Sequence, residues 1–264
     1  MIHVQGLTKT YRVPKRASGL KETLRALAHR ETETIEAVRD LTFTVRPGEM
    51  IGYIGPNGAG KSTTIKMLSG ILVPDSGQCV ILGRTPWLQR KEHVRHIGVV
   101  FGQRSQLWWD VPVQDSFDLL RDIYRVPEND YRQALGQLID VMDLGSLLRT
   151  PVRTLSLGQR MRCELAASLL HRPEILFLDE PTIGLDAVSK LAVRRFIRER
   201  NQQEGTTVIL TTHDMNDIEA LTDRILLIGK GRLLYDGSLD DLRGKYEEEN
   251  LDQLVVSLYR DHSL

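Results

Sequence analysis

A short stretch near position 60 has the residue types and the spacing needed to hold a phosphate group. Residues 55–63 read GPNGAGKST and fit the pattern G-x-x-x-x-G-K-[ST]. Glycines let the backbone approach an anion closely, so that its N–H groups can bind phosphate oxygens. In this pattern Lys61 reaches the β- and γ-phosphates and Ser62 binds Mg²⁺. We expect the remaining nucleotide contacts from Gly55, Asn57, Gly58, Gly60 and Thr63. The alternative is a glycine-rich turn that binds nothing.

The segments on either side of this stretch support phosphate binding. Residues 50–54 are apolar and indicate a short buried strand, and residues 63–68 begin a helix that can end at Gly70. A strand, a glycine-containing turn and a helix N-terminus together form a cradle of N–H groups for anionic oxygens.

Two carboxylates follow a second apolar strand. Residues 175–178 read ILFL, and Asp179 and Glu180 come directly after them. Buried parallel strands end at the same edge of a sheet, which would bring these acids to the phosphate-binding stretch. We expect Asp179 to hold Mg²⁺ and Glu180 to act as the general base that activates water. The alternative is a strand that merely ends in two acids.

The elements that must position these groups alternate between strands and helices. Strands are expected at 35–45, 78–82, 97–101 and 207–210, with an edge strand in residues 1–11 and a hairpin formed by 224–228 and 232–235. Helical spacing covers 113–124, 131–144 and 191–200. Asn250 and Gln253 have the spacing of a capping box before a short amphipathic helix, whose apolar face would dock on its own domain.

These elements predict a single α/β domain over residues 1–264. Residues 1–103 and 158–240 would form its core, residues 104–157 an all-helical insertion, and residues 241–264 a helical tail.

The composition excludes several classes of protein. The 264 residues contain 35 basic and 35 acidic side chains, so no net charge favours nucleic acid. The two cysteines, Cys79 and Cys163, are expected to be reduced thiols in a cytosolic protein. The N-terminus has no signal-peptide layout, and no apolar run is long enough to span a bilayer.

Residues 12–30 interrupt the pattern with six basic side chains against one acid, Glu22. Ser18 could cap a short helix there. The simpler interpretation is a solvated basic insertion, and the alternative is a basic amphipathic segment near lipid headgroups or a membrane partner.

Three further motifs follow in a fixed order: LSLGQ at 155–159, GLD at 184–186 and TTHD at 211–214. With the phosphate-binding stretch and the acidic pair, they give the chain a specific resemblance, over roughly residues 1–240, to the nucleotide-binding subunit of ATP-binding cassette (ABC) transporters. The resemblance implies a P-loop NTPase (RecA-like) core with a mainly parallel sheet, an N-terminal antiparallel β part and an inserted all-helical subdomain.

The resemblance also implies roles for single residues. Tyr11 stands where the adenine-stacking aromatic belongs, and Gln103 where the Q-loop glutamine that binds Mg²⁺ belongs. Asp186 resembles the D-loop aspartate, and His213 resembles the switch histidine that bonds the γ-phosphate. The alternatives are surface packing of the tyrosine, turn hydrogen bonds of a buried amide, and a structural histidine.

The LSLGQ motif resembles the family signature L-S-G-G-Q, with Leu157 in place of its first glycine. In the family this motif meets the nucleotide of the opposite subunit, through Ser156, Gly158 and Gln159. The resemblance therefore implies two subunits, as a homodimer or with a sister cassette, closing ATP between them. A helix N-terminus with a hydroxyl suits a γ-phosphate, and an ordinary helix cap is the alternative.

Two adjacent tryptophans, Trp108 and Trp109, follow Gln103. In the family this region receives a helix of the membrane subunit, and exposed aromatics would anchor it; core packing of the pair is the alternative. This stretch resembles the ATPases paired with ABC-2-type permeases, which implies an exporter subunit at the cytoplasmic face of the membrane. The alternatives are a soluble ABC ATPase acting on ribosomes or DNA and a binding-only nucleotide switch.

Overall fold

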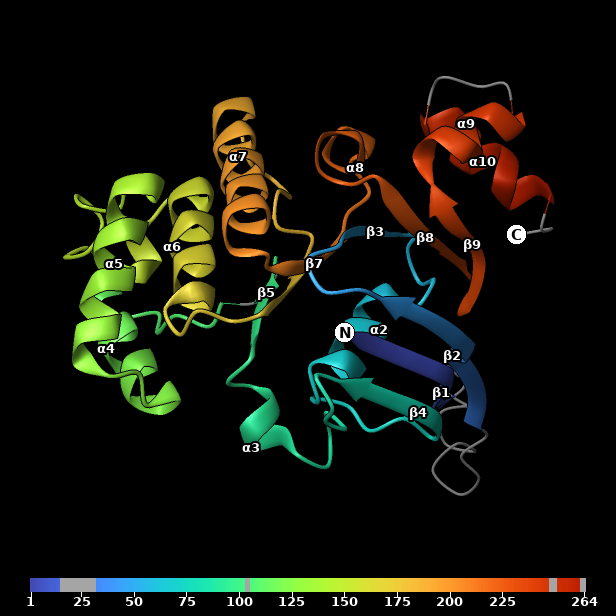
Figure 1. Ribbon diagram of the computed structural model, residues 1–264, viewed down its shortest axis with the longest axis horizontal. Coiled ribbons are helices and arrows are strands. Elements are labelled where there is room, and N and C mark those ends of the chain that lie inside the picture. The colour runs from blue at the N-terminus through green and yellow to red at the C-terminus, as the bar shows by residue number, and fades with distance from the viewer. Residues whose placement is uncertain (15–31, 103–104, 247–250, 262–264) are drawn as a thin grey trace, which may run out of the picture.

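The computed structural model describes residues 1–14, 32–102, 105–246 and 251–261, and consists of two sheets with helices packed around them (Figure 1). The predictions for Gln103, Asn250 and residues 15–30 of the basic insertion lie outside the described residues.

The larger sheet has six strands in the order β5-β6-β7-β3-β8-β9. Neighbouring strands from β5 to β8 run parallel, and β9 closes the sheet as an antiparallel partner of β8. The predicted hairpin and the mainly parallel sheet are therefore confirmed. The strands are β3 (Met50–Ile54), β5 (Ile97–Phe101), β6 (Ile175–Asp179), β7 (Thr207–Thr211), β8 (Arg224–Gly229) and β9 (Arg232–Ser238).

The smaller sheet is antiparallel and has the order β2-β1-β4, formed by β1 (Ile2–Pro14), β2 (Thr32–Val45) and β4 (Ser76–Ile81). The prediction of an edge strand at the N-terminus is wrong, because β1 lies in the centre of this sheet. Its first half is bonded on both sides, with Ile2 opposite Val45 on β2 and Ile81 on β4. The later strand that covers its second side cannot be recognised from the N-terminal residues alone.

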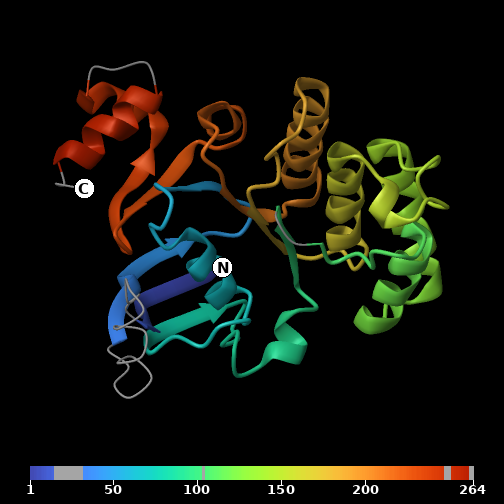
Figure 2. The ribbon, with the colours of Figure 1, turned by 180° about the vertical axis from the view of Figure 1, so that it is seen from behind.

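Ten helical segments are described, and three of them, α4, α5 and α6, form a group on one side of the molecule in both views (Figures 1 and 2). Helices α9 and α10 lie at the opposite end, next to β9. The segments are α2 (Lys61–Leu68), α3 (Arg90–His93), α4 (Val113–Tyr124), α5 (Glu128–Met142), the 3₁₀ turn η1 (Val152–Thr154), α6 (Leu157–Leu169), α7 (Ala187–Glu204), α8 (Met215–Leu221), α9 (Leu239–Tyr246) and α10 (Leu251–Asp261).

Both faces of the six-stranded sheet are buried. Strand β6 shows this directly, because Leu176 and Leu178 belong to the core cluster shared with the helices, whereas Ile175 and Phe177 belong to the cluster shared with the smaller sheet. Alternate residues of a strand point to opposite faces, so a strand buried on both sides is apolar throughout. This explains the unbroken apolar run that precedes the acidic pair.

Several helices differ from the sequence prediction: α5 spans Glu128–Met142 against the predicted 131–144, and α3 and α8 were not predicted. Helix α7 begins four residues before the predicted position 191, because Asp186 caps it by accepting the Ser189 N–H at 2.9 Å. Helix α9 begins two residues before the helical tail expected at 241–264. Helix α10 lies within that tail, and its Leu254 is fully buried in the larger core cluster, so its apolar face does dock on its own domain.

Candidate functional site

A cavity of about 580 Å³ lies where β3 and β6 end and α2 begins. The phosphate-binding stretch, the acidic pair and the histidine, which are up to about 150 residues apart in the sequence, all border it. Its lining residues are Ala37, Pro56, Asn57, Gly58, Gly60, Lys61, Ser62, Thr63, Lys66, Phe101, Gly102, Asp179, Glu180, Ile183 and His213.

Two glycines of the phosphate-binding stretch are required by close backbone contacts. Gly60 has φ +105°, and a Cβ there would lie 2.2 Å from the carbonyl oxygen of Ala37 on β2. A Cβ on Gly55 would lie 2.6 Å from the carbonyl oxygen of Ile228. Strands from both sheets therefore press against the turn, and only glycine allows that approach.

Lys61 is a mostly buried cation that lines the cavity. Its side chain is 8% exposed, and Nζ donates to the carbonyl oxygen of Gly55 at 2.6 Å. Burial lowers the pKa of Lys61, and the negative charges of Glu180 and Asp179 oppose that shift. The amine thus stands between the backbone of the turn and two carboxylates, where an anionic ligand can bind it.

The N-terminus of α2 is fixed from behind by a hydrogen-bonded pair that sequence reasoning missed. The buried hydroxyl of Tyr53 on β3 lies 3.0 Å from Oγ1 of Thr64, which donates to the carbonyl oxygen of Gly60 at 3.1 Å. This places Thr63 and Ser62, which precede Thr64 by one and two residues, at the cavity wall.

The acidic pair adopts an unusual backbone conformation. Asp179 is 8% exposed and accepts the Thr211 hydroxyl at 2.5 Å through Oδ1. Glu180 has φ +57°, a left-handed conformation that costs a non-glycine residue roughly 1–2 kcal/mol. Its N–H donates to the carbonyl oxygen of Thr211 at 2.9 Å, which fixes the bend. The sheet therefore directs both carboxylates into the cavity at the cost of local strain.

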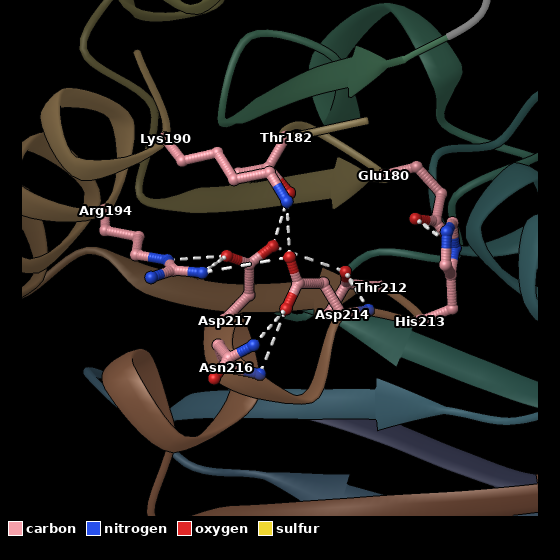
Figure 3. A network of polar contacts seen from close by, with 9 residues as sticks. All are labelled: Glu180, Thr182, Lys190, Arg194, Thr212, His213, Asp214, Asn216 and Asp217. Carbon is pink, nitrogen blue, oxygen red and sulfur yellow. Dashed lines mark hydrogen bonds and ion pairs between the residues drawn. The ribbon is translucent and has the colours of Figure 1, made fainter. Parts of the chain in front are cut away.

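His213 contacts Glu180 directly. Its Nδ1 lies 2.9 Å from Oε2 of Glu180, and the imidazole is 61% exposed whereas the carboxylate is 18% exposed (Figure 3). The turns after β6 and β7 carry these two residues, and the two strands are adjacent in the sheet.

The oxygen donors at the cavity suit Mg²⁺. The hydroxyl of Ser62 and the carboxylate of Asp179 line the same cavity. Mg²⁺ binds one or two carboxylates with water and substrate phosphates and does not need a cage of protein ligands.

The residues of the LSLGQ motif lie outside the lining of this cavity. Of the described residues that line the cavity, none belongs to this motif or to the GLD motif. Ser156 caps α6 in a capping box: its Oγ accepts the Gln159 N–H at 3.2 Å, and its own N–H donates to Gln159 Oε1 at 2.9 Å. The N–H groups at the first two helix positions, here Leu157 and Gly158, have no acceptor inside a helix. They can receive an external anion even though Ser156 is also an ordinary cap.

The departure at Leu157 has a structural explanation. A Cβ on Gly184 would lie 2.5 Å from Cδ2 of Leu157, so the leucine packs onto that glycine. A Cβ on Gly158 would lie 2.8 Å from Oγ of Ser189, which bonds Asp186 at 2.8 Å. The LSLGQ and GLD motifs thus form one surface, and the leucine side chain is accommodated within it.

Comparison with known proteins assigns the family. The family model described as "ABC transporter" matches residues 38–183, more than half of the chain. The chain belongs to the ABC transporter family. The resemblance seen in the motifs and the ABC ATPase fold are thereby confirmed.

Two relatives and one solved structure are similar to this ABC cassette over most of its length. "Probable multidrug ABC transporter ATP-binding protein YbhF" of Escherichia coli is 34% identical over 232 residues, covering 85% of this chain but only 39% of YbhF. "ABC transporter ATP-binding protein NatA" of Bacillus subtilis is 29% identical over 225 residues, covering 85% of this chain and 91% of NatA. The dimeric cassette MJ0796, solved in a post-hydrolysis state with ADP and Pi, is 25% identical with a TM-score of 0.75, covering 90% of this chain and 99% of that one.

The adenine-stacking role of Tyr11 stays a prediction. The residue lies on β1 opposite Ile35 and is 38% exposed, which leaves its ring accessible. Among the described residues the cavity lining includes Ala37 of the neighbouring strand but not Tyr11.

Several cavity residues were not predicted from the sequence. Lys66 follows Lys61 on α2, where its spacing from the phosphate-binding motif could have drawn attention to it. Ala37, Phe101 and Ile183 have no local pattern that marks them, because they reach the cavity only through the pairing of separate strands and turns.

Proposed function

We propose that this cassette hydrolyses ATP in the cavity between α2 and β6 and that its hydrolysis drives a separate membrane permease. The observation that carries the proposal is the convergence of Lys61, Glu180 and His213 on one cavity, with Glu180 and His213 in contact. A phosphate cradle, a general base and a histidine donor are the groups that phosphoryl transfer to water needs.

In this proposal the turn at residues 55–60 binds the phosphates through its backbone N–H groups, and Lys61 exchanges its bond to the Gly55 carbonyl for phosphate oxygens. Ser62 and Asp179 would hold Mg²⁺, which neutralises charge on the transferred phosphoryl group when bound. Glu180 accepts a proton from the attacking water. His213 orients the Glu180 carboxylate and donates to the γ-phosphate. Gln103 and Tyr11 keep their proposed roles at the metal and the adenine.

We propose that two cassettes share each ATP. The paired surface formed by Ser156, Gly158 and Asp186 offers N–H groups and a hydroxyl but lies apart from the cavity of its own chain, and the similar cassette MJ0796 is a dimer. The partner is a second copy or a sister cassette. ATP binding would close the pair, and product release would open it.

We further propose an ABC-2-type exporter as the transporter. Trp108 and Trp109 are 41% and 50% exposed, which disfavours core packing of the pair. The guanidinium of Arg160 lies 5.7 Å from the centre of the Trp109 ring, so the ring is held in place at the surface. Exposed, positioned aromatics suit the docking of a permease helix, and the relative YbhF is named as a multidrug protein. No helix in the described part of the chain is long and apolar enough to cross a membrane.

A pull-down tests this proposal. The tagged Glu180→Gln variant is captured with ATP from detergent-solubilised membranes of the native host, and bound proteins are identified by mass spectrometry. We expect a stoichiometric multi-spanning protein, which the double change Trp108→Ala and Trp109→Ala loses. Ile35→Ala, which trims an exposed apolar side chain on β2, should retain it. Recovery of ribosomal or DNA-associated proteins without a membrane partner would contradict the proposal.

A further inference from the structure

A buried carboxylate behind the cavity connects three segments of the site. Asp217 on α8 is 0% exposed. Its Oδ1 accepts from Arg194 on α7, at 2.6 Å from Nε and 2.5 Å from Nη2 (Figure 3). Its Oδ2 accepts the hydroxyl of Thr182 and, at 3.4 Å, the hydroxyl of Thr212. One oxygen thus bridges the turn after β6 and the turn after β7.

Those two turns carry Glu180 and His213. Thr182 lies two residues after Glu180, and Thr212 is the residue before His213. The turns meet in front at the Glu180–His213 contact of 2.9 Å and behind at Oδ2 of Asp217. Figure 3 shows the Asp217 cluster set apart from the Glu180–His213 pair, so Asp217 acts on the pair only through the two turns.

Two cationic side chains pair with Asp217 and with its neighbouring carboxylate. Lys190 and Arg194, both on α7, face Asp214 and Asp217, with Lys190 bonded to Asp214 and Nη2 of Arg194 3.9 Å from Asp214 Oδ2. Asp214 in turn donates its N–H to Thr212 Oγ1 at 3.0 Å. A paired network around a fully buried carboxylate holds its members in a single arrangement, and loss of a partner would leave the buried charge of Asp217 uncompensated.

We propose that Asp217 is a positioning residue for hydrolysis: by bridging Thr182 and Thr212 it sets the distance between Glu180 and His213 and ties both to α7. This inference rests on the proposed roles of Glu180 and His213. The same helix begins at Asp186 of the GLD motif. Through α7 the network therefore also connects the GLD surface, which would face the second cassette, to the Glu180–His213 pair.

A double-mutant cycle tests the inference. Asp217→Asn keeps the shape of the side chain and removes its charge, and it is made alone and together with His213→Ala. The kcat for ATP hydrolysis and the Kd for ATP are measured for each protein. If Asp217 acts by placing His213, its single change lowers kcat about tenfold or more, leaves the Kd within about threefold, and adds almost nothing once His213 is absent.

Two further variants complete the test. Thr182→Val removes one of the bridging hydroxyls with little change of shape, and it should reproduce the fall in kcat in milder form even if Asp217→Asn does not fold. Glu49→Gln disturbs an ion pair with Arg224 (3.1 Å) away from the two turns and should leave kcat unchanged.

An unchanged kcat for both Asp217→Asn and Thr182→Val overturns the inference, as does an equal fall with and without His213, which would mark a general structural role. If His213→Ala alone leaves kcat at the wild-type value, the proposed role of His213 itself fails.

Discussion

Nδ1 of His213 and Oε2 of Glu180 lie 2.9 Å apart, which makes the histidine the direct neighbour of the proposed general base. The carboxylate is mostly covered and the imidazole is 61% exposed at the mouth of the cavity. This geometry suits the two tasks proposed for the pair: Glu180 would accept a proton from water inside the cavity, and His213 would hold Glu180 and bond the terminal phosphate.

Removing the imidazole should slow hydrolysis without abolishing nucleotide binding. We expect His213→Ala to lower kcat by about 10²-fold, the lower range for loss of a hydrogen-bond donor to the reacting group, with the ATP Kd changed little. His96→Ala is the matched control, because His96 also bonds a glutamate, Glu174, at 2.8 Å but lies outside the cavity lining among the described residues. Steady-state hydrolysis and nucleotide titration check this. Equal losses for both variants would contradict it.

Two glycines of the phosphate-binding turn should differ sharply in their tolerance of alanine. Gly60 and Gly58 both have positive φ, at +105° and +81°, but a Cβ on Gly60 meets the Ala37 carbonyl at 2.2 Å whereas one on Gly58 has no described atom within 4 Å. Gly58→Ala should lower the free energy of unfolding by about 1–2 kcal/mol, and Gly60→Ala by more than about 3 kcal/mol with loss of ATP binding. Urea unfolding and ATP titration measure both, and similar values for the two variants would show that the contact with β2 is unimportant.

Mixing two inactive variants tests whether two copies share each ATP. Lys61→Ala removes the phosphate-binding cation, and Ser156→Arg places a bulky side chain on the cap of α6. In a mixed dimer one composite site keeps both native residues. Random pairing should therefore restore about a quarter of the wild-type hydrolysis rate. No restoration would contradict sharing between identical copies and would favour a sister cassette as the partner.

Glu164 should make stability depend on pH. It is 3% exposed on α6, accepts the Gln106 N–H at 3.1 Å, and bonds Ser105, just after the position of Gln103. Burial raises the pKa of this carboxyl, and the hydrogen bonds oppose that shift. The folded protein therefore holds the proton more tightly than the unfolded chain. The stabilising contribution of the carboxyl is fully present below its unfolded pKa of about 4.3 and is lost as pH rises through the higher folded pKa.

The Glu164→Gln variant lacks this titration. The free energy of unfolding of wild type relative to Glu164→Gln should therefore fall as pH rises above the unfolded pKa of about 4.3, as measured by urea unfolding. A pH-independent difference would contradict the proposed burial of the carboxyl.

The sequence predicted those parts of the fold and site that local chemistry controls. Helix α4 occupies the predicted residues 113–124, because its apolar spacing and the preceding Pro112 both fix its start. The cavity lining contains Lys61, Asp179 and His213 as expected, since each follows a recognisable buried strand or turn. The roles of these residues stay predictions.

What the sequence did not reveal depends on contacts between distant segments. The central position of β1 follows from a strand that begins 74 residues after Ile2, and the contact of Ala37 with Gly60 follows from the packing of one sheet on the other. The bridge from Asp217 to Thr182 and Thr212 is similar. Each residue looks like an ordinary polar residue of a turn or helix until the two turns are placed next to each other.

The most direct measurement of the central claim compares hydrolysis and binding in the Glu180→Gln variant. Glutamine keeps the size of the side chain but cannot take a proton from water. We expect an ATP Kd close to that of wild type and single-turnover hydrolysis slower by at least about 10²-fold. Wild-type hydrolysis by Glu180→Gln would contradict the assignment of Glu180 as the base and, with it, the proposed chemistry of the cavity.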